Sequence, residues 1–361
     1  GDVQPVLALA LEVRALSHEV RLCVPPNFIE AARARGFTAH AVGVEMRAPR
    51  PGTARVAAPP SLPDLIRDQF DAIAAAAQGC DVILGANAHQ YAARSVAELY
   101  GIPYVNALYA PTALPDEENT RAWNDRALQR VNENRVRLGL SPISDVLRHI
   151  VTERPWLATD AALCPLPWIP GLNILQTGAW ILTDESPLST SLNAFLDAGE
   201  PPVYLGFGSM PVSADTSHTL IGGARALGRR SILSRGWADL ASIDDAADCI
   251  AVQDVNHQAL FPRVAAVVHH GGAGTTLAAA RAGAPQVVVP MFSDQPFWGS
   301  RVRALGIGTS VPIAELTPER LAHALGEVST SEIAEAARSL SGRIAVDGAA
   351  AAARRLVREL E

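Results

Sequence analysis

The sequence predicts an α/β protein with doubly wound parallel sheets in two domains. Short apolar runs of strand length alternate with longer, Ala-rich segments that favour helix, which is the pattern of consecutive βαβ units. A length of 361 residues is enough for two domains with separate cores. The alternation is interrupted once and then resumes. We therefore expect a first domain at 1–182, a linker at 183–200 and a second domain at 201–361.

The composition excludes several classes of protein. A net charge of −7 with no basic stripe argues against nucleic-acid binding. No apolar run could span a bilayer and no signal peptide opens the chain, so we expect a cytoplasmic protein. Four cysteines lie scattered without metal or redox spacing, which favours reduced thiols. The sequence has no lysine, so any bound phosphate must be held by backbone amides, hydroxyls, His or Arg.

The first half alternates between strands and helices but begins with a helix. We expect helices at 6–16, 27–35, 65–78, 92–100, 126–138 and 144–150, and strands at 18–24, 37–44, 81–84, 103–107 and 173–177. Because an α/β domain usually opens with a strand, we expect that the first strand is missing from this sequence. The abrupt change between Pro115 and Asp116 suggests missing loop residues too. Residues 47–63 are rich in Pro and Arg and predict an acceptor-binding loop.

The second half repeats the pattern. We expect strands at 203–207, 231–234, 249–252, 264–268, 286–289 and 308–311. Helices are expected at 188–198, 216–227, 256–261, 277–282, 317–326, 331–340 and 348–360.

A strand, a Gly-rich turn and a helix follow one another near residue 270. The turn reads His269-His270-Gly271-Gly272-Ala273-Gly274-Thr275-Thr276. In this order the free amides and positive dipole end of the helix make an anion site, and phosphate is the anion we expect. Glycine lets the backbone close on phosphate oxygens, and the threonines can donate hydroxyls or cap the helix. A tight turn that binds nothing is the alternative, and the pattern alone does not separate the two.

Further polar residues follow other predicted strands, so they belong to the same carboxyl edge of the sheet, where α/β proteins bind ligands. Ser209 ends a second Gly loop, Gly206-Phe207-Gly208-Ser209, and Asp294-Gln295 follows strand 286–289. Asp294 and Gln295 could instead form a polar turn before Pro296.

These motifs resemble the nucleotide-sugar box of the GT-B glycosyltransferases that act on natural products. Seven residues have the spacing of that box: His270, Gly272, Thr275, Pro285, Pro290, Asp294 and Gln295. Segments 176–182 and 234–240 resemble sequence segments that recur in actinobacterial antibiotic glycosyltransferases, particularly those that act on vancomycin-type glycopeptides. The resemblance covers nearly the whole chain.

The resemblance implies two Rossmann-like domains facing an interdomain cleft, with the last helix crossing back to the first domain. It implies an inverting, metal-independent transfer of a deoxysugar from a TDP-sugar to an aglycone hydroxyl, with no cofactor besides the donor. The implied nucleotide-diphosphate residues are Ser209, Trp237, Val255, His270, Gly271, Gly272, Ala273, Gly274, Thr275 and Thr276. Trp237 could equally belong to the core, and His270 could be a hydrogen-bonded strand-end residue, although a neighbouring phosphate would favour its charged form.

Asp294 and Gln295 are implied to hold the donor sugar, and Asp2 and Asp294 compete as the catalytic base. Asp at the start of a helix is more commonly an N-cap, and only the resemblance favours catalysis by Asp2. The glutamate with which plant members bind ribose hydroxyls is replaced by Ala278, which favours TDP over UDP.

Other functions remain open at this stage. They are a UDP-sugar-dependent transferase acting on a polyketide, lipid or sterol, a nucleotide-sugar 2-epimerase, and a catalytically silent relative that stabilises a partner. No Asp-x-Asp pair suggests a metal, and Asp244-Asp245 is interpreted as a solvated turn.

Overall fold

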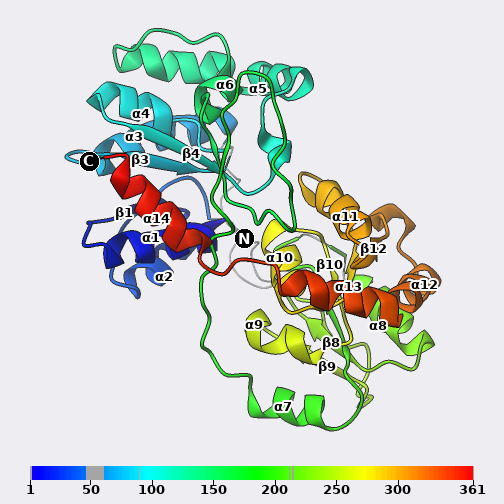
Figure 1. The fold of residues 1–361 in the computed structure, drawn as a ribbon. Coiled ribbons are helices and arrows are strands. Elements are labelled where there is room, and N and C mark those ends of the chain that lie inside the picture. Colours follow the sequence, from blue (N-terminus) through cyan, green and yellow to red (C-terminus); the bar gives the residue numbers. More distant parts are fainter. Residues whose placement is uncertain (1, 46–60, 88, 211, 214, 361) are drawn as a thin grey trace. The chain divides into compact units, whose positions relative to one another are not determined.

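The computed structural model describes residues 2–45, 61–87, 89–210, 212–213 and 215–360. The chain forms two compact units. The first comprises Gly1–Ala161, Pro165–Leu182 and Ala345–Glu361, and the second comprises Ala162–Cys164 and Thr183–Ile344. Most of the predicted loop at 47–63 lies outside the described residues. The C-terminal segment groups with the N-terminal half, where helix α14 (Gly348–Arg358) packs against α1 (Val3–Ala15) (Figure 1).

The first unit contains two parallel sheets. Strands β1 (Arg21–Val24) and β2 (Thr38–Ala41) pair with each other, and β3 (Ile83–Ala86), β4 (Tyr104–Leu108), β5 (Trp156–Leu157) and β6 (Leu175–Gln176) form a four-stranded sheet in that order. Its other helices are α2 (Ile29–Arg33), α3 (Leu62–Ala76), α4 (Ala93–Tyr100), α5 (Glu117–Arg137) and α6 (Val146–Val151), with short 3-10 turns at Pro26–Phe28 and Pro111–Ala113. Helices cover both sides of the sheets, with α3 and α4 on one side and α1 and α14 on the other (Figure 1).

Two predictions for this unit need correction. Helix α5 begins at Glu117, nine positions before the predicted start at 126, because Asp116 caps it by accepting a hydrogen bond from Asn119 N (2.7 Å). Its first turn is polar, so hydrophobic periodicity did not reveal it. Strand β5 was not predicted at all, since two residues cannot show a period.

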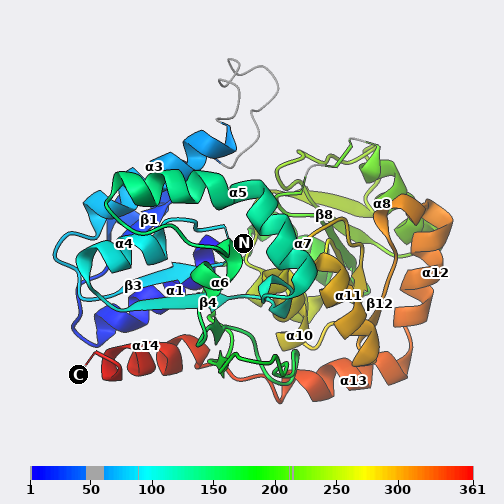
Figure 2. The same cartoon turned by 90° about the horizontal axis from the view of Figure 1, so that it is seen from above.

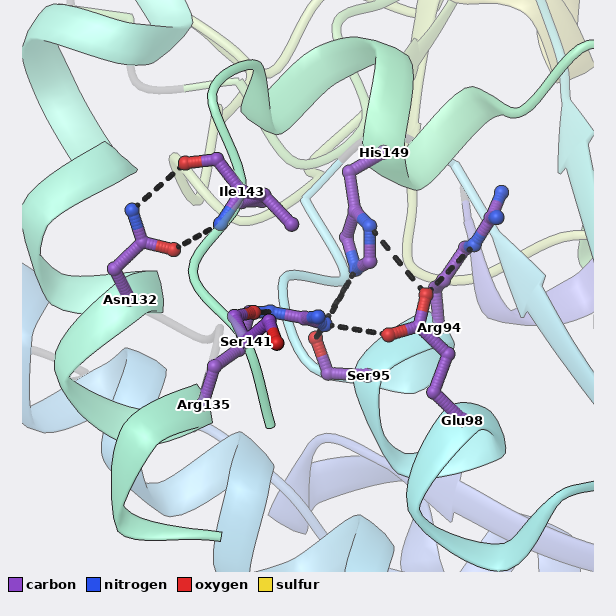
Figure 3. Close-up of polar contacts among 8 residues, drawn as sticks. All are labelled: Arg94, Ser95, Glu98, Asn132, Arg135, Ser141, Ile143 and His149. Carbon is purple, nitrogen blue, oxygen red and sulfur yellow. Dashed lines mark hydrogen bonds and ion pairs between the residues drawn. The ribbon is translucent and has the colours of Figure 1, made fainter. Parts of the chain in front are cut away.

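A buried polar cluster joins α4, α5 and α6 (Figure 3). Arg135 on α5 is 4% exposed, donates to Ser95 Oγ (2.9 Å) and pairs with Glu98 Oε2 (2.8 Å). His149 Nε2 lies 3.1 Å from the same hydroxyl, and His149 Nδ1 lies 3.8 Å from Glu98. The pKa of His149 is lowered to about 4, mainly by burial of the ring. The nearby carboxylate of Glu98 raises this pKa, whereas Arg135 and Arg94 lower it further. The imidazole is therefore neutral at pH 7, and the cluster connects three helices through one buried guanidinium.

The second unit is built on one six-stranded parallel sheet in the order β12-β11-β10-β7-β8-β9. The strands are β7 (Val203–Gly206), β8 (Ser231–Ser234), β9 (Cys249–Val252), β10 (Ala266–His269), β11 (Gln286–Val288) and β12 (Gly308–Ser310). The helices are α7 (Thr190–Asp197), α8 (Thr216–Ala226), α9 (His257–Leu260), α10 (Ala273–Arg281), α11 (Gln295–Ala304), α12 (Pro318–Val328) and α13 (Ser331–Ser341), with short 3-10 turns at Phe261–Arg263 and Ile313–Glu315.

Alternate residues of these strands face two different apolar clusters. Leu205 and Val268 pack into the cluster that includes α8 and α12, which lie side by side (Figure 2). Their neighbours Tyr204 and Val267 pack into the cluster formed with α7, α9 and α10. Because both faces are covered, the central strands β7 and β10 are mainly apolar, and this is why their positions could be predicted from short apolar runs.

Helix α11 is the main element of this unit that the sequence analysis missed. The sequence analysis expected no helix after Asp294, and a polar turn before Pro296 was its alternative interpretation of Asp294 and Gln295. Pro296 instead occupies the first turn of the helix, where its missing N–H has no intrahelical partner to lose. Helix α10 also begins earlier than predicted, at Ala273 instead of 277, because Gly272 occupies its N-cap position. Both differences place predicted site residues at helix starts.

Candidate donor and acceptor sites

The turn between β10 and α10 is held by a buried histidine. His269 is fully buried, donates from Nε2 to Gln286 Oε1 (2.9 Å) and accepts the Gly271 N–H at Nδ1 (3.1 Å). Burial lowers the pKa of His269 to about 3, so both bonds involve the neutral ring. Gly271 has φ +89°, and a Cβ there would meet Val288 at 2.7 Å. The turn thus requires glycine for both its backbone conformation and its packing.

Helix α10 begins without a side-chain cap. Its N-cap is Gly272, so amides of the first turn have no side-chain acceptor. Gly274 is exposed and Thr275 is half-buried, whereas Thr276 is fully buried and donates its hydroxyl to Gly272 O (3.0 Å). The hydroxyl proton of Thr276 is therefore used inside the helix. The backbone amides and Thr275 remain as donors for an anion.

His270 lies between the two glycine-rich loops. A Cβ on Gly272 would collide with His270 Nε2, and one on Gly208 would lie 3.5 Å from His270 Cε1. The Nδ1 atom is buried and has no hydrogen-bond partner among the described residues. Burial lowers the pKa of His270 to about 4, so the ring is neutral without a ligand. An orphaned ring nitrogen between two close backbone turns fits a polar ligand atom.

The second Gly loop is packed against the segment that follows β8. Gly208 O accepts a hydrogen bond from Trp237 N (2.8 Å), and a Cβ on Gly236 would collide with that carbonyl. Ser209 and Trp237 are both half-buried. The loop that ends at Ser209 therefore lies next to the α10 turn, since an added Cβ on Gly208 would lie 3.5 Å from the His270 ring.

Val255, which lies between β9 and α9, and Ala278, which lies on α10, border one apolar cluster. Both are partly buried against the cluster that contains Tyr204 and Val267. Val255, an implied nucleotide-binding residue, and Ala278, which replaces the ribose-binding glutamate of the plant members, therefore lie on the same part of the unit.

Asp294 and Gln295 start α11 but have different surroundings. Asp294 Oδ2 accepts the indole N–H of Trp298 (2.8 Å). Gln295 is 3% exposed, and its Oε1 accepts from Met291 N (2.8 Å) and Phe292 N (3.3 Å). The carbonyl half of this amide therefore closes its own loop. Only Nε2, bonded to the weak acceptor Met210 Sδ (3.2 Å), keeps hydrogen-bonding capacity for a sugar.

Asp2 stands at the start of α1 in the first unit. It is exposed, and its side chain makes no capping hydrogen bond to the helix. Its backbone carbonyl accepts the hydroxyl of Tyr109 (3.2 Å), which ties the start of α1 to the end of β4. Capping, the more common use of Asp at a helix start, is therefore absent, and the carboxylate is available for chemistry.

Sequence reasoning did not identify the residues that contact Asp294 and Asp2. The Asp294–Trp298 pair has the i, i+4 spacing of a helix, so recognising α11 would have revealed it. The contact between Tyr109 and Asp2 joins residues 107 positions apart and leaves no local signal.

The fold and the loops at its sheet edge define a GT-B glycosyltransferase. Two solved structures share the fold over 99% of this chain. They are the glycosyltransferase of kitacinnamycin (TM-score 0.75, 21% identity, 95% of that chain) and the spinosyn forosaminyltransferase (TM-score 0.74, 17% identity, 96% of that chain). Residues 234–357 match the C-terminal domain of the erythromycin biosynthesis protein CIII-like family.

The chain belongs to the vancomycin-group glycopeptide glycosyltransferases. It is 45% identical to the vancomycin aglycone glucosyltransferase of Amycolatopsis orientalis, over 99% of this chain and 94% of the relative. It is 42% identical to the dTDP-epi-vancosaminyltransferase of the same organism, over 92% of this chain and 88% of the relative. The predicted family, fold class and enzyme class are thereby confirmed. In the described residues, no helix is long and apolar enough to cross a membrane.

Proposed function

We propose that this protein is an inverting glycosyltransferase that moves a deoxysugar from a TDP-sugar to a hydroxyl of a glycopeptide-type aglycone, without a metal. The observation that carries the donor side is the uncapped start of α10 beside the orphaned His270 Nδ1. Backbone amides aimed at one point supply fixed positive charge, which is what a departing diphosphate needs.

Each residue then has a defined role in the transfer. The Asp2 carboxylate takes the proton of the acceptor hydroxyl as general base, and the acceptor oxygen attacks the anomeric carbon from the face opposite the diphosphate. The bond between the sugar and the diphosphate breaks, and its electron pair leaves with the nucleotide. The α10 amides, Ser209 and His270 take up the charge that develops on the diphosphate. Asp294 and the Nε2 of Gln295 hold sugar hydroxyls.

The preference for TDP rests on Ala278. A methyl group beside the apolar cluster offers nothing to a ribose 2′-hydroxyl, so a deoxyribose loses no contact there. One relative's name specifies a dTDP-sugar, which supports the same donor class.

The decisive experiment combines binding with product analysis. TDP and UDP are titrated separately by calorimetry, and we expect TDP to bind more tightly. TDP-glucose and a vancomycin-type aglycone are then incubated with the protein, and the product is analysed by mass spectrometry and by NMR of the anomeric proton. Failure of both nucleotides to bind would contradict the donor site, and retention of the anomeric configuration would contradict inversion. A freed sugar epimerised at C2, with no adduct, would support the epimerase instead.

A further inference from the structure

The indole N–H of Trp298 has an acceptor that packing alone does not explain. Trp298 on α11 is 1% exposed, and no fully buried side chain among the described residues is larger. Its Nε1 donates to Asp294 Oδ2 (2.8 Å), one helical turn earlier. A buried indole N–H needs an acceptor, whereas a phenyl ring could fill an apolar space without one. Helix α11 therefore directs its buried donor to one of the two residues that are implied to hold the donor sugar.

Asp294 does not cap the helix that it begins. It occupies the N-cap position of α11, but its side chain makes no capping hydrogen bond. An aspartate at this position usually accepts an N–H from the first turn of its own helix. Here the carboxylate accepts from the indole side chain one turn further along. The common structural use of the residue is therefore absent, as it is for Asp2.

The start of α11 is packed against the turn that is proposed to bind the diphosphate. A Cβ on Gly271 would lie 3.1 Å from Gln295 O and 3.3 Å from Gln295 Cβ. One residue beyond Trp298, a Cβ on Gly299 would lie only 2.7 Å from Ser310 Oγ on β12. Close packing on both sides leaves α11 no room to move toward either neighbour. A side chain that is held by α11 itself is therefore held in place relative to the α10 turn.

We propose that Trp298 is a positioning residue for the donor sugar, whose indole N–H holds the Asp294 carboxylate in the conformation that accepts a sugar hydroxyl. This inference rests on the proposed function, in which Asp294 contacts the sugar. A hydrogen bond to an ionised carboxylate is stronger than one between neutral groups. It keeps the carboxylate from turning to the first-turn amides of α11, which would otherwise bind it as a cap. Because Trp298 is 1% exposed, it does not reach the ligand and acts only through Asp294.

The indole signal of Trp298 tests this role without turnover. The six tryptophans are followed by NMR, and the indole N–H signal that is absent from Trp298→Phe identifies Trp298. We expect TDP-glucose to shift this signal more than TDP alone does, because only the sugar adds a hydrogen bond to Asp294. Equal shifts by the two ligands, or no shift when calorimetry shows that both are bound, would refute the proposal.

Calorimetry with TDP and TDP-glucose then separates the sugar from the nucleotide. Trp298→Phe should bind TDP-glucose about tenfold more weakly than wild type does, the lower end of the effect of one hydrogen bond to a charged group, and should bind TDP normally. Asp294→Ala should show the same selective loss. Adding Trp298→Phe to it should cause no further loss, because residues that act through one another are non-additive. Losses that multiply, or a loss of TDP affinity, would show that Trp298 acts through packing and would overturn the proposal.

The matched control is Trp180→Phe in the first unit. Trp180 is 4% exposed and donates its indole N–H to Thr177 Oγ1 (3.1 Å), so this variant loses a comparable buried hydrogen bond. It should lose stability in urea as Trp298→Phe does, yet it should keep wild-type affinity for TDP-glucose.

If Trp298→Phe does not fold, Trp298 is replaced by an isosteric analogue in which sulfur takes the place of the indole N–H. Wild-type affinity of that protein for TDP-glucose would overturn the proposal. Equal binding of TDP-glucose by wild type and Trp298→Phe overturns this inference alone. Failure of the wild-type protein to bind either ligand would overturn the proposed function and this inference with it.

Discussion

Acid should destabilise the first unit through His149, and replacing this residue should remove that sensitivity. The ring is 6% exposed and neutral in the fold, with a pKa of about 4 against an ordinary value of about 6.5. Unfolded chains therefore bind one more proton than folded ones between these two pH values, so the free energy of unfolding falls as pH falls. At about 1.4 kcal/mol per pH unit, the full loss is about 3 kcal/mol by pH 4, and above about pH 6.5 the contribution is complete.

Urea unfolding of wild type and His149→Gln at a series of pH values between 7.5 and 4.5 measures this contribution. Glutamine can keep a hydrogen bond to Ser95 but does not titrate, so the variant should be less stable at neutral pH and the gap should narrow toward pH 4.5. Three histidines of the second unit, His257, His269 and His270, also have lowered pKa values, and they affect both proteins equally. A gap that stays constant with pH would refute the reasoning. His18→Gln serves as the exposed control.

Four further predictions concern the two candidate sites. Gly272→Ala should weaken TDP binding, measured by calorimetry, at least about tenfold, because the added Cβ displaces His270. The control Gly326→Ala, whose Cβ meets nothing within 4 Å, should bind TDP normally. Equal TDP affinities of the two variants would contradict the donor site. Asp294→Asn should raise KM for the TDP-sugar more than it changes affinity for TDP, and a loss of TDP affinity alone would assign Asp294 to the nucleotide. Asp2→Asn should lower kcat by about a hundred-fold or more while TDP affinity stays unchanged, and near-normal kcat would transfer the role of base to Asp294. Excess EDTA should leave the transfer rate unchanged, and a loss restored by Mg²⁺ would disprove metal independence.

The sequence predicted the sheet of the second unit well because burial there is strong and local. Strands β8 and β9 match their predicted bounds, since each is a short apolar run between polar residues. Helix α11 could not be recognised in the same way. Its mean character is polar, and its start coincides with a Pro that also suits a turn.

The candidate site was predictable where backbone conformation dictates residue type and less so elsewhere. Gly271 stood out because its positive φ and its packing against Val288 both require glycine. The engagement of Gln295 by the amides of its own loop depends on how residues 291–295 fold back, which no spacing reveals.

The C-terminal helix has a practical consequence for exchanging acceptor specificity between relatives. Gly178 and Gly348 approach so closely that a Cβ on Gly178 would lie 3.0 Å from the Gly348 Cα, and a Cβ on Gly348 would collide with Ala179 O. The first unit is therefore not a contiguous stretch of gene. A chimera cut once near residue 182 would combine the α14 of one parent with the Gly178–Ala179 segment of another, at a contact with no room for an added Cβ. Transplants should instead carry Ala345–Glu361 together with the N-terminal half.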